Sequence, residues 1–401
     1  MRINEYNPDT ARARKLVESN VRRLNSLMER DGIDALFVNT FDNWRYVTGL
    51  PVHHSISYST VNAAILVRGA SLAVLLPLDF FASRIRVAAP WYTIIKELPF
   101  PGTPEPLQPT GSDQWPKLIS EALMELGLAN GVIAIDPGTA WVIQENLRSY
   151  LPKATFRDAS NVLADARIIK NEDEVDAIRK AGRIADIAIE AALSKAREGI
   201  SEFELAGVVE SFFRSNEAEF PSMMPCVFSG DHPQLGYICS SDRKLRSGEL
   251  VRLDIGCAVD GYCSCIARTG FVGQPDEELL RTYELLRSAL RAGIESTRPG
   301  VTNSYVHEAM HQVLHEGSGG KYGLDWYGGH GIGLGLHEQP LIGRAGTVTE
   351  IVLEAGMVFA LEPAILLEGK GWLGLEDNVV VRPGGSEVLN LAKFELQPIG
   401  A

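Results

Sequence analysis

Hydrophobic residues in the first part of the chain alternate between the spacing of helices and that of buried strands. Ala11 to Asp31 carry spaced apolar positions, Ala35 to Val38 form a short apolar run, and Asn62 to Leu76 supply two more. After a proline-rich passage, Pro99 to Pro109, which is typical of a surface loop, Val132 to Ile135 form another apolar run. This alternation predicts an α/β layer domain.

A long amphipathic helix opens the second part of the chain. Asn171 and Glu174 have the spacing of a capping box, which marks the start of a helix. The apolar residues that follow at spacings of three and four form one stripe, which needs a sheet to cover: Val175, Ile178, Ala181, Ala185, Ala188 and Ala192. We therefore expect two domains, residues 1–160 and residues 161–401.

The helices of the second domain follow a pattern that occurs twice. Ser201 and Glu204 form a second capping box, and a leucine-rich helix begins later at Asp276. Between the helices of each pair stands the same Arg-x-Gly-aliphatic-Ser/Thr connector, at 197–201 and at 298–302. The pattern predicts an internal duplication of helix, connector, helix and strands.

A hairpin in the first copy brings polar side chains to an apolar strand. Asp260-Gly261 is a strong two-residue turn, and counting outward from it places Asp254 diagonally across from Cys265 on one face. A buried aspartate needs a compensating partner, so Asp254 either pairs with Arg252 or Arg268 or belongs to a functional site.

Further carboxylates and imidazoles follow in the second copy. His330 and His337 lie in the glycine-rich segment Gly328 to Glu338, and Glu362 and Glu376 each stand where an apolar strand is expected to end. The segment does not match a dinucleotide-binding glycine pattern, because its spacing differs and no helix follows. Together with Asp254, these groups form an oxygen-rich set with one nitrogen, suited to Mn, Co, Fe or Zn.

Composition narrows the class of protein. The formal net charge of -13 and the lack of a basic run argue against nucleic acid, so small molecules or peptides are the expected partners. Five clustered cysteines form a poor disulfide framework, which favours reduced thiols. Without an apolar run long enough for a signal peptide or a spanning helix, we expect a cytoplasmic protein and no membrane partner.

The motifs resemble those of the creatinase/prolidase/aminopeptidase P family. The resemblance rests on Asp254, Gly261 to Thr269, Gly329 to Glu338, Glu362-Pro363 and Glu376 in this order, and more weakly on Asn43 to Gly49. It implies an α/β (α+β) chain with a creatinase-like N-terminal domain and a C-terminal pita-bread domain, whose internal pseudo-twofold duplication matches the repeat above.

In metal-dependent relatives the matching positions bind two divalent ions. The resemblance implies that Asp254 holds one ion, that His330 and Glu362 hold the other, and that Glu376 and residue 265 bridge them. His337 would orient or protonate the tetrahedral intermediate. A water held between the ions would be the nucleophile, since bound cations lower its pKa.

Two positions depart from the family pattern. Cys265 stands where metallopeptidase relatives carry aspartate, and Tyr237 stands where they place a catalytic histidine, which His232 could replace. One ion bound by His330, Glu362, Glu376 and Cys265 is therefore an alternative to two. The substitution is also compatible with a Cys265 nucleophile activated by His330, or with an inert Cys265 in a site without metal.

His307 to His311 also match the H-E-x-x-H motif of zinc metalloproteases. The apolar stripe Val306, Met310, Val313 and Leu314 leaves His307, His311 and His315 on a flank of the helix, which favours a structural helix over a zinc site.

These features predict a hydrolase of an amide or related C–N bond in a small substrate, either Xaa-Pro peptidase-like or creatinase-like. A metal-independent amidinohydrolase or another small-metabolite hydrolase is a second hypothesis, and a non-catalytic binding protein on the same fold is a third. The family implies a homodimer, in which Arg45, His53 and His54 of the first domain could bind a substrate carboxylate in the partner's pocket.

Overall fold

The structure is a computed structural model that describes residues 10–51, 62–99, 114–231 and 239–400. It divides into two compact units, Met1–Arg167 and Ile168–Ala401. The predicted positions His53, His54, His232 and Tyr237 lie outside the described residues.

The first unit is built on a mixed sheet with the strand order β3-β2-β1-β4-β5. The strand β1 pairs antiparallel with β2 and parallel with β4. The strands are β1 (Ala35–Val38), β2 (Asn62–Val67), β3 (Val74–Pro77), β4 (Val132–Ile135) and β5 (Thr155–Asp158). The helices are α1 (Thr10–Asp31), α2 (Phe41–Thr48), α3 (Asp79–Ala88), α4 (Gln114–Glu125), α5 (Trp141–Tyr150) and α6 (Ser160–Ile168). The predicted α/β layer domain is thereby confirmed.

The second unit contains two pairs of long helices. These are α7 (Glu172–Lys195) with α8 (Glu202–Ser215), and α9 (Glu277–Ser296) with α10 (Asn303–Gly317). Asn171 and Ser201 form the predicted capping boxes, and Asp276 and Thr302 cap the other two helices through their side chains. A cap of this kind satisfies backbone N–H groups that the first helical turn leaves unpaired.

Two larger sheets lie between these helices, with the orders β19-β11-β8-β7 and β13-β12-β14-β17-β18. The first copy supplies β6 (Phe220–Pro221), β7 (Cys226–Ser229), β8 (Leu250–Ile255), β9 (Cys257–Val259), β10 (Tyr262–Cys263) and β11 (Ile266–Val272). The second supplies β12 (Tyr327–Gly331), β13 (Glu338–Gly343), β14 (Val358–Leu361), β15 (Ala364–Leu367), β16 (Gly371–Gly374), β17 (Asp377–Arg382), β18 (Gly385–Val388) and β19 (Gln397–Ile399).

The strand orders reveal the duplication. In each copy two helices precede three antiparallel strands, β7-β8-β11 in the first and β12-β14-β17 in the second. The connectors match as well: Gly199 and Gly300 both have positive φ, and their N–H groups donate to the carbonyls of Leu245 and Leu353. The predicted repeat is therefore present in the backbone.

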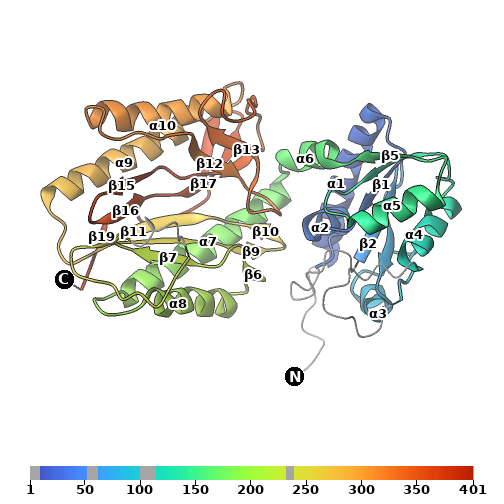
Figure 1. Ribbon diagram of the computed structural model, residues 1–401, viewed down its shortest axis with the longest axis horizontal. Helices are drawn as coiled ribbons and strands as arrows, with labels where there is room; N and C mark the ends of the chain where they lie inside the picture. The colour runs from blue at the N-terminus through green and yellow to red at the C-terminus, as the bar shows by residue number, and fades with distance from the viewer. Residues whose placement is uncertain (1–9, 52–61, 100–113, 232–238, 401) are drawn as a thin grey trace. The chain divides into compact units, whose positions relative to one another are not determined.

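Each helix pair buries its apolar stripe against one sheet, so the strands lie in the middle of the second unit (Figure 1). The stripe predicted for α7 is fully buried, and its residues from Ala181 to Ala192 pack with residues of α8, β8 and β11 in one core cluster. A second cluster joins α9 and α10 to β14 and β17. Each of the two sheets is consequently held in place by the helix pair that packs on it.

The hairpin follows the predicted register. Tyr262 pairs with Val259 across Asp260 and Gly261, which both have positive φ as a type I′ turn requires. Further along, Asp254 pairs with Ala267, so Cys265 is its diagonal neighbour. The turn chemistry thus fixes which polar side chains meet.

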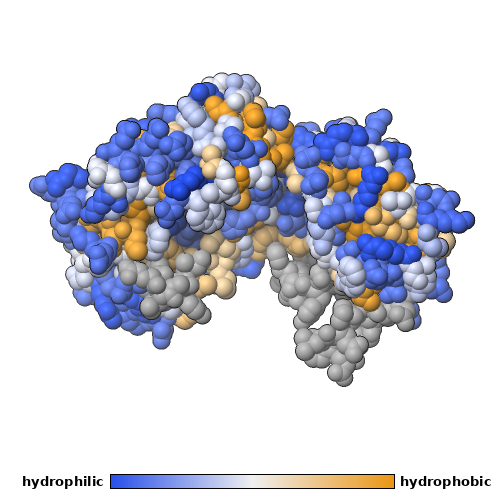
Figure 2. Space-filling model, turned by 45° about the horizontal axis from the view of Figure 1, so that its top comes forward, coloured by the Kyte–Doolittle hydropathy of each residue, from blue (hydrophilic) through white to orange (hydrophobic). Residues whose placement is uncertain are grey.

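The visible face of the molecule is mostly hydrophilic, with smaller hydrophobic areas between charged side chains (Figure 2). Among the described residues, every helix is too short or too polar to cross a membrane.

A buried ion pair connects the two copies. Arg268 of β11 donates to Asp377 Oδ1 at 2.7 Å and to the main-chain oxygen of Glu376 at 2.8 Å, and both ionic side chains are at most 3% exposed. Removing one partner of such a pair leaves an uncompensated buried charge.

We therefore expect Arg268→Met to lower the free energy of unfolding by about 3–5 kcal/mol, measured by chemical denaturation. The exposed Arg281→Met is the matched control and should change it by less than about 0.5 kcal/mol. A loss below about 1 kcal/mol for Arg268→Met would contradict the assigned role.

Candidate active site

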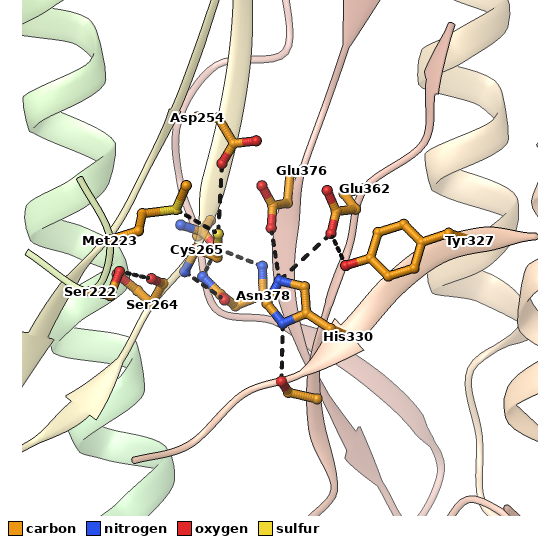
Figure 3. Close-up of polar contacts among 12 residues, drawn as sticks. Ser222, Met223, Asp254, Ser264, Cys265, Tyr327, His330, Glu362, Glu376 and Asn378 are labelled. Atoms are coloured by element: carbon orange, nitrogen blue, oxygen red, sulfur yellow. Dashed lines mark hydrogen bonds and ion pairs between the residues drawn. The ribbon is translucent and has the colours of Figure 1, made fainter. Parts of the chain in front are cut away.

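Five of the predicted site residues converge between the two sheets of the second unit (Figure 3). Asp254 lies near the end of β8 and Cys265 immediately precedes β11; His330 lies in β12, Glu362 follows β14 and Glu376 precedes β17. Glu376 therefore stands at the start of a strand, and the expectation that it ends one is wrong. The cause is the β15–β16 hairpin, which returns the chain just before this residue.

The duplication accounts for this convergence. Asp254 lies two residues beyond Arg252, which pairs with Phe228 of β7, and Glu362 lies two residues beyond Ala360, which pairs with His330 of β12. Asp254 and Glu362 therefore occupy corresponding positions of the two copies. The middle strand of each copy, β8 in the first and β14 in the second, therefore directs one carboxylate into the space between the two sheets.

His330 presents one nitrogen to the carboxylates. Its Nδ1 lies 3.0 Å from the carbonyl oxygen of Gly331, which can only accept, so Nδ1 carries the proton of the neutral ring. Its Nε2 lies 3.6 Å from Glu362 Oε1 and 3.7 Å from Glu376 Oε1. A lone pair fixed in this way is what a metal-ligating imidazole needs.

Glu376 is the least compensated charge of the site. Its side chain is completely buried, and neither carboxylate oxygen accepts a hydrogen bond within the described part of the chain. A buried carboxylate without donors is costly unless a cation lies against it. This orphaned group, beside a correctly oriented imidazole, fits a divalent ion.

Two overlapping sets of ligand atoms are close enough to share an ion. One consists of Cys265, His330 and Glu376, and the other of Asp254, Glu362 and Glu376. Glu376 is common to both sets and is thus the centre of the candidate metal site.

Burial and crowding shift the proton affinities of these groups. Burial alone would lower the pKa of His330, but the Glu376 and Glu362 carboxylates outweigh it and raise the pKa to about 9. Without an ion the ring is therefore protonated at neutral pH, and a divalent ion would bind Nε2 by displacing that proton. Burial and then the charge of Glu376 raise the pKa of Glu362 to about 7. The hydroxyl of Tyr327 donates to Glu362 Oε1 at 2.7 Å and partly offsets this shift. Glu362 is thereby suited to exchange protons near neutral pH.

Asp254 has an arginine partner. Arg252 Nη2 donates to Asp254 Oδ2 at 3.0 Å, which is the pairing weighed from the sequence, whereas Arg268 pairs with Asp377. Burial raises the pKa of Asp254 and Arg252 opposes that shift. Asp254 therefore pairs with Arg252 and also belongs to the candidate site.

Cys265 is buried among acidic groups. Its Sγ lies 3.8 Å from Asp254 Oδ1, and its backbone N–H donates to Asn378 Oδ1 at 3.2 Å. Burial, followed by the charges of Glu376 and Asp254, raises the pKa of this thiol well above its usual value. An activated thiolate needs the opposite environment, with cationic neighbours.

Buried polar contacts hold the glycine-rich segment in place, and others hold the backbone around Cys265. Lys170 Nζ lies 3.1 Å from Glu338 Oε2, and Glu338 Oε1 accepts the N–H of Gly335, which anchors the glycine-rich segment. Behind Cys265, Asn378 donates to Asn390, which in turn donates to Asp186. Sequence reasoning assigned no separate role to these groups or to Tyr327, because each contacts a residue that is distant in sequence.

The remaining predicted residues have different surroundings. The ring of His337 stacks obliquely on that of His330 at 4.2 Å between centroids, and burial followed by His330 lowers the pKa of His337. Arg45 lies in α2 and is only 8% exposed within the first unit. A role for Arg45 in substrate binding stays a prediction.

The H-E-x-x-H histidines have other structural contacts. The prediction that His307 lies on a flank is wrong, because it is 1% exposed and both its ring nitrogens lack a hydrogen bond within the described chain. His311 Nδ1 lies 2.9 Å from the carbonyl oxygen of Leu324, to which it donates, and so fixes the loop after α10. Burial and then His311 lower the pKa of His307 to about 4.

Comparison with known proteins identifies the family to which this chain is related. A model of metallopeptidase family M24 matches residues 176–383, and a model of the creatinase/prolidase N-terminal domain matches residues 21–169. An Xaa-Pro dipeptidase of Pyrococcus horikoshii is 29% identical over 382 residues, which cover 95% of this chain and 99% of that protein. One of Pyrococcus furiosus is 33% identical over 66% of this chain and 75% of its own length.

Solved structures agree with the sequence matches. The Xaa-Pro dipeptidase of Bacillus anthracis superposes with a TM-score of 0.80 at 25% identity, covering 96% of this chain and all of that one. A dipeptidase of Pyrococcus horikoshii gives 0.80 at 27% identity, covering 95% of this chain and all of that one. The family resemblance and the two-domain fold predicted from the sequence are confirmed.

The orphaned carboxylate leads to a stability prediction. Glu376→Gln should change the free energy of unfolding of ion-free protein by at most about 1 kcal/mol, because it removes the burial cost of the carboxylate together with its attraction to the His330 ring 3.7 Å away. The same change should abolish the rise in Tm that added Mn²⁺ or Co²⁺ produces in the unaltered protein. The exposed Glu368→Gln serves as the control. A Glu376→Gln protein that still gains Tm with these ions would argue against a cation site.

The burial of His307 predicts how the stability of the protein depends on pH. Its folded-state pKa lies below the unfolded value, so the unfolded chain binds the extra proton and stability is lost as pH falls through about 6.5. Between pH 7 and pH 5 the unaltered protein should lose roughly 2 kcal/mol more than His307→Leu, measured by urea denaturation. His315→Gln on the exposed side of α10 should behave like the unaltered protein. Parallel pH curves for His307→Leu and the unaltered protein would refute the burial effect.

Proposed function

The chain belongs to metallopeptidase family M24 and is a hydrolase, and we propose that it cleaves the amide bond of Xaa-Pro dipeptides with a single divalent ion. The observation that carries this proposal is the buried Glu376 carboxylate, which lacks hydrogen-bond donors within the described chain and faces His330 and Glu362. Xaa-Pro dipeptidases are also the relatives that match nearly the whole chain.

The ion would be held by His330, Glu362 and Glu376. Manganese, cobalt, iron and zinc all accept this mixture of one imidazole and carboxylates. The ion would lower the pKa of a bound water and polarise the substrate carbonyl. Cys265 takes the place of a bridging carboxylate, and its single sulfur offers one ligand atom where a carboxylate offers two. The loss of this bridging carboxylate favours one ion over two.

The side chains around this site are suited to move the protons of an amide hydrolysis. Glu362 Oε1 would take a proton from the attacking water and return it to the departing amine nitrogen, since a carboxylate beside the bound water can act as a general base. Tyr327 holds that carboxylate in place through its hydroxyl. His337, whose pKa is lowered, would stay neutral and donate an N–H to the developing oxyanion.

The substrate would also need a partner for its carboxylate. Arg45, His53 and His54 of the first domain are the proposed cationic groups, acting on the pocket of a second subunit in a homodimer. His232 and Tyr237 are the candidates for a further proton donor near the substrate.

The function is tested by turnover of Xaa-Pro dipeptides, with creatine and related guanidino compounds as the other substrates. Glu362→Gln should lower kcat at least about 100-fold, because it removes the proton acceptor, while Glu368→Gln keeps full activity. Chelation should abolish turnover, and Mn²⁺, Co²⁺, Fe²⁺ or Zn²⁺ should restore it.

The competing functions give different results in the same assay. Turnover that resists chelation would favour a metal-independent hydrolase. Failure to turn over any of these substrates with the ion bound would favour a non-catalytic binding protein. Full activity of Glu362→Gln would refute the proposed mechanism.

A further inference from the structure

Arg252 is a cation built into the carboxylate cluster. It lies in β8 and is only 7% exposed, and its Nη2 lies 3.0 Å from Asp254 Oδ2 and 3.8 Å from Glu362 Oε2. Its guanidinium carbon lies 5.7 Å from the centre of the Phe228 ring. One guanidinium thus contacts the corresponding carboxylates of both copies.

The duplication shows what Arg252 replaces. In the second copy, His330 of β12 faces the small Ala360 of β14. At the corresponding positions of the first copy, Phe228 of β7 faces Arg252 of β8. The first copy therefore has an aromatic ring where the second has a ligating imidazole, and a guanidinium where the second has a methyl group. The two copies therefore keep the corresponding carboxylates Asp254 and Glu362, but only the first copy places a guanidinium on its middle strand.

The surrounding backbone makes room for the guanidinium. A Cβ atom at Gly374 of β16 would lie 2.8 Å from both Cζ and Nε of Arg252, which is too close for any side chain there. The neighbouring Thr269 fixes Gly374 by accepting its N–H and donating to its carbonyl. Arg252 is therefore closely packed against Gly374, next to the carboxylates.

We propose that Arg252 is a resident cation that takes the place of one of two metal ions, so that the site binds a single ion beside His330 and Glu376. This inference rests on the proposed single-ion function and explains it. Three carboxylates, Asp254, Glu362 and Glu376, are neutralised by one guanidinium and one divalent ion. An ion bound to Asp254 would have to share that carboxylate with a guanidinium already paired to it.

The test counts bound cobalt by equilibrium dialysis and elemental analysis of the whole chain, without any substrate. The unaltered protein should bind one ion, and so should Cys265→Asp, because Arg252 still occupies the Asp254 side. The double variant Arg252→Met with Cys265→Asp should bind two, since it has four carboxylates and no resident cation. Absorption spectra of the bound cobalt should change between the one-ion and two-ion proteins.

Two matched double variants control for charge and folding. Cys265→Asp combined with the exposed Arg281→Met should bind one ion, as should Cys265→Asp combined with Arg252→Lys, which keeps the charge. The proposal is overturned by an unaltered protein that binds two ions or none, or by a double variant with Arg252→Met that binds no more than the unaltered protein. The ion count needs no turnover. A protein that binds one ion but does not hydrolyse Xaa-Pro dipeptides would refute the proposed function and still support the role of Arg252.

Discussion

The repulsion among buried carboxylates is the constraint on which the second unit depends. Asp254, Glu362 and Glu376 come from strands of both copies, and the fold brings their oxygens within a few ångströms of one another. Such a cluster is stable only with cations against it, because the Glu376 oxygens accept no hydrogen bond within the described residues and the His330 ring lies 3.7 Å away. The duplicated helices and sheets supply the packing energy that keeps the strands in place against this repulsion.

Two cations of different kinds can balance the cluster. Arg252 is part of the chain and neutralises the Asp254 side at all times, whereas a divalent ion would balance His330, Glu362 and Glu376 only when bound. Cys265 and Arg252 then change the charge balance in the same direction. The cysteine removes one carboxylate and the arginine adds one positive charge, so both lower the metal charge that the cluster needs. A hydrolase with a single ion is the function that this balance favours.

Much of the fold could be predicted because its signals are local. The Asn171 and Ser201 capping boxes and the Asp260-Gly261 turn depend on neighbouring residues, and the register of the hairpin follows from that turn alone. The pairing of Arg252 with both Asp254 and Glu362 could not be predicted in full, because Glu362 is distant in sequence. The burial of His307 was missed for a related reason: which flank of α10 is covered depends on the packing of the distant strand β12, whose Gly328 lies against the His307 ring.

The central claim is that one divalent ion and Arg252 share the carboxylate cluster. Anomalous diffraction from crystals of cobalt-loaded protein at the cobalt absorption edge tests it most directly. The account predicts one anomalous peak, in contact with His330 Nε2 and Glu376, with Arg252 still paired to Asp254. Two peaks, or a single peak between Asp254 and Glu362 with Arg252 displaced, would contradict it.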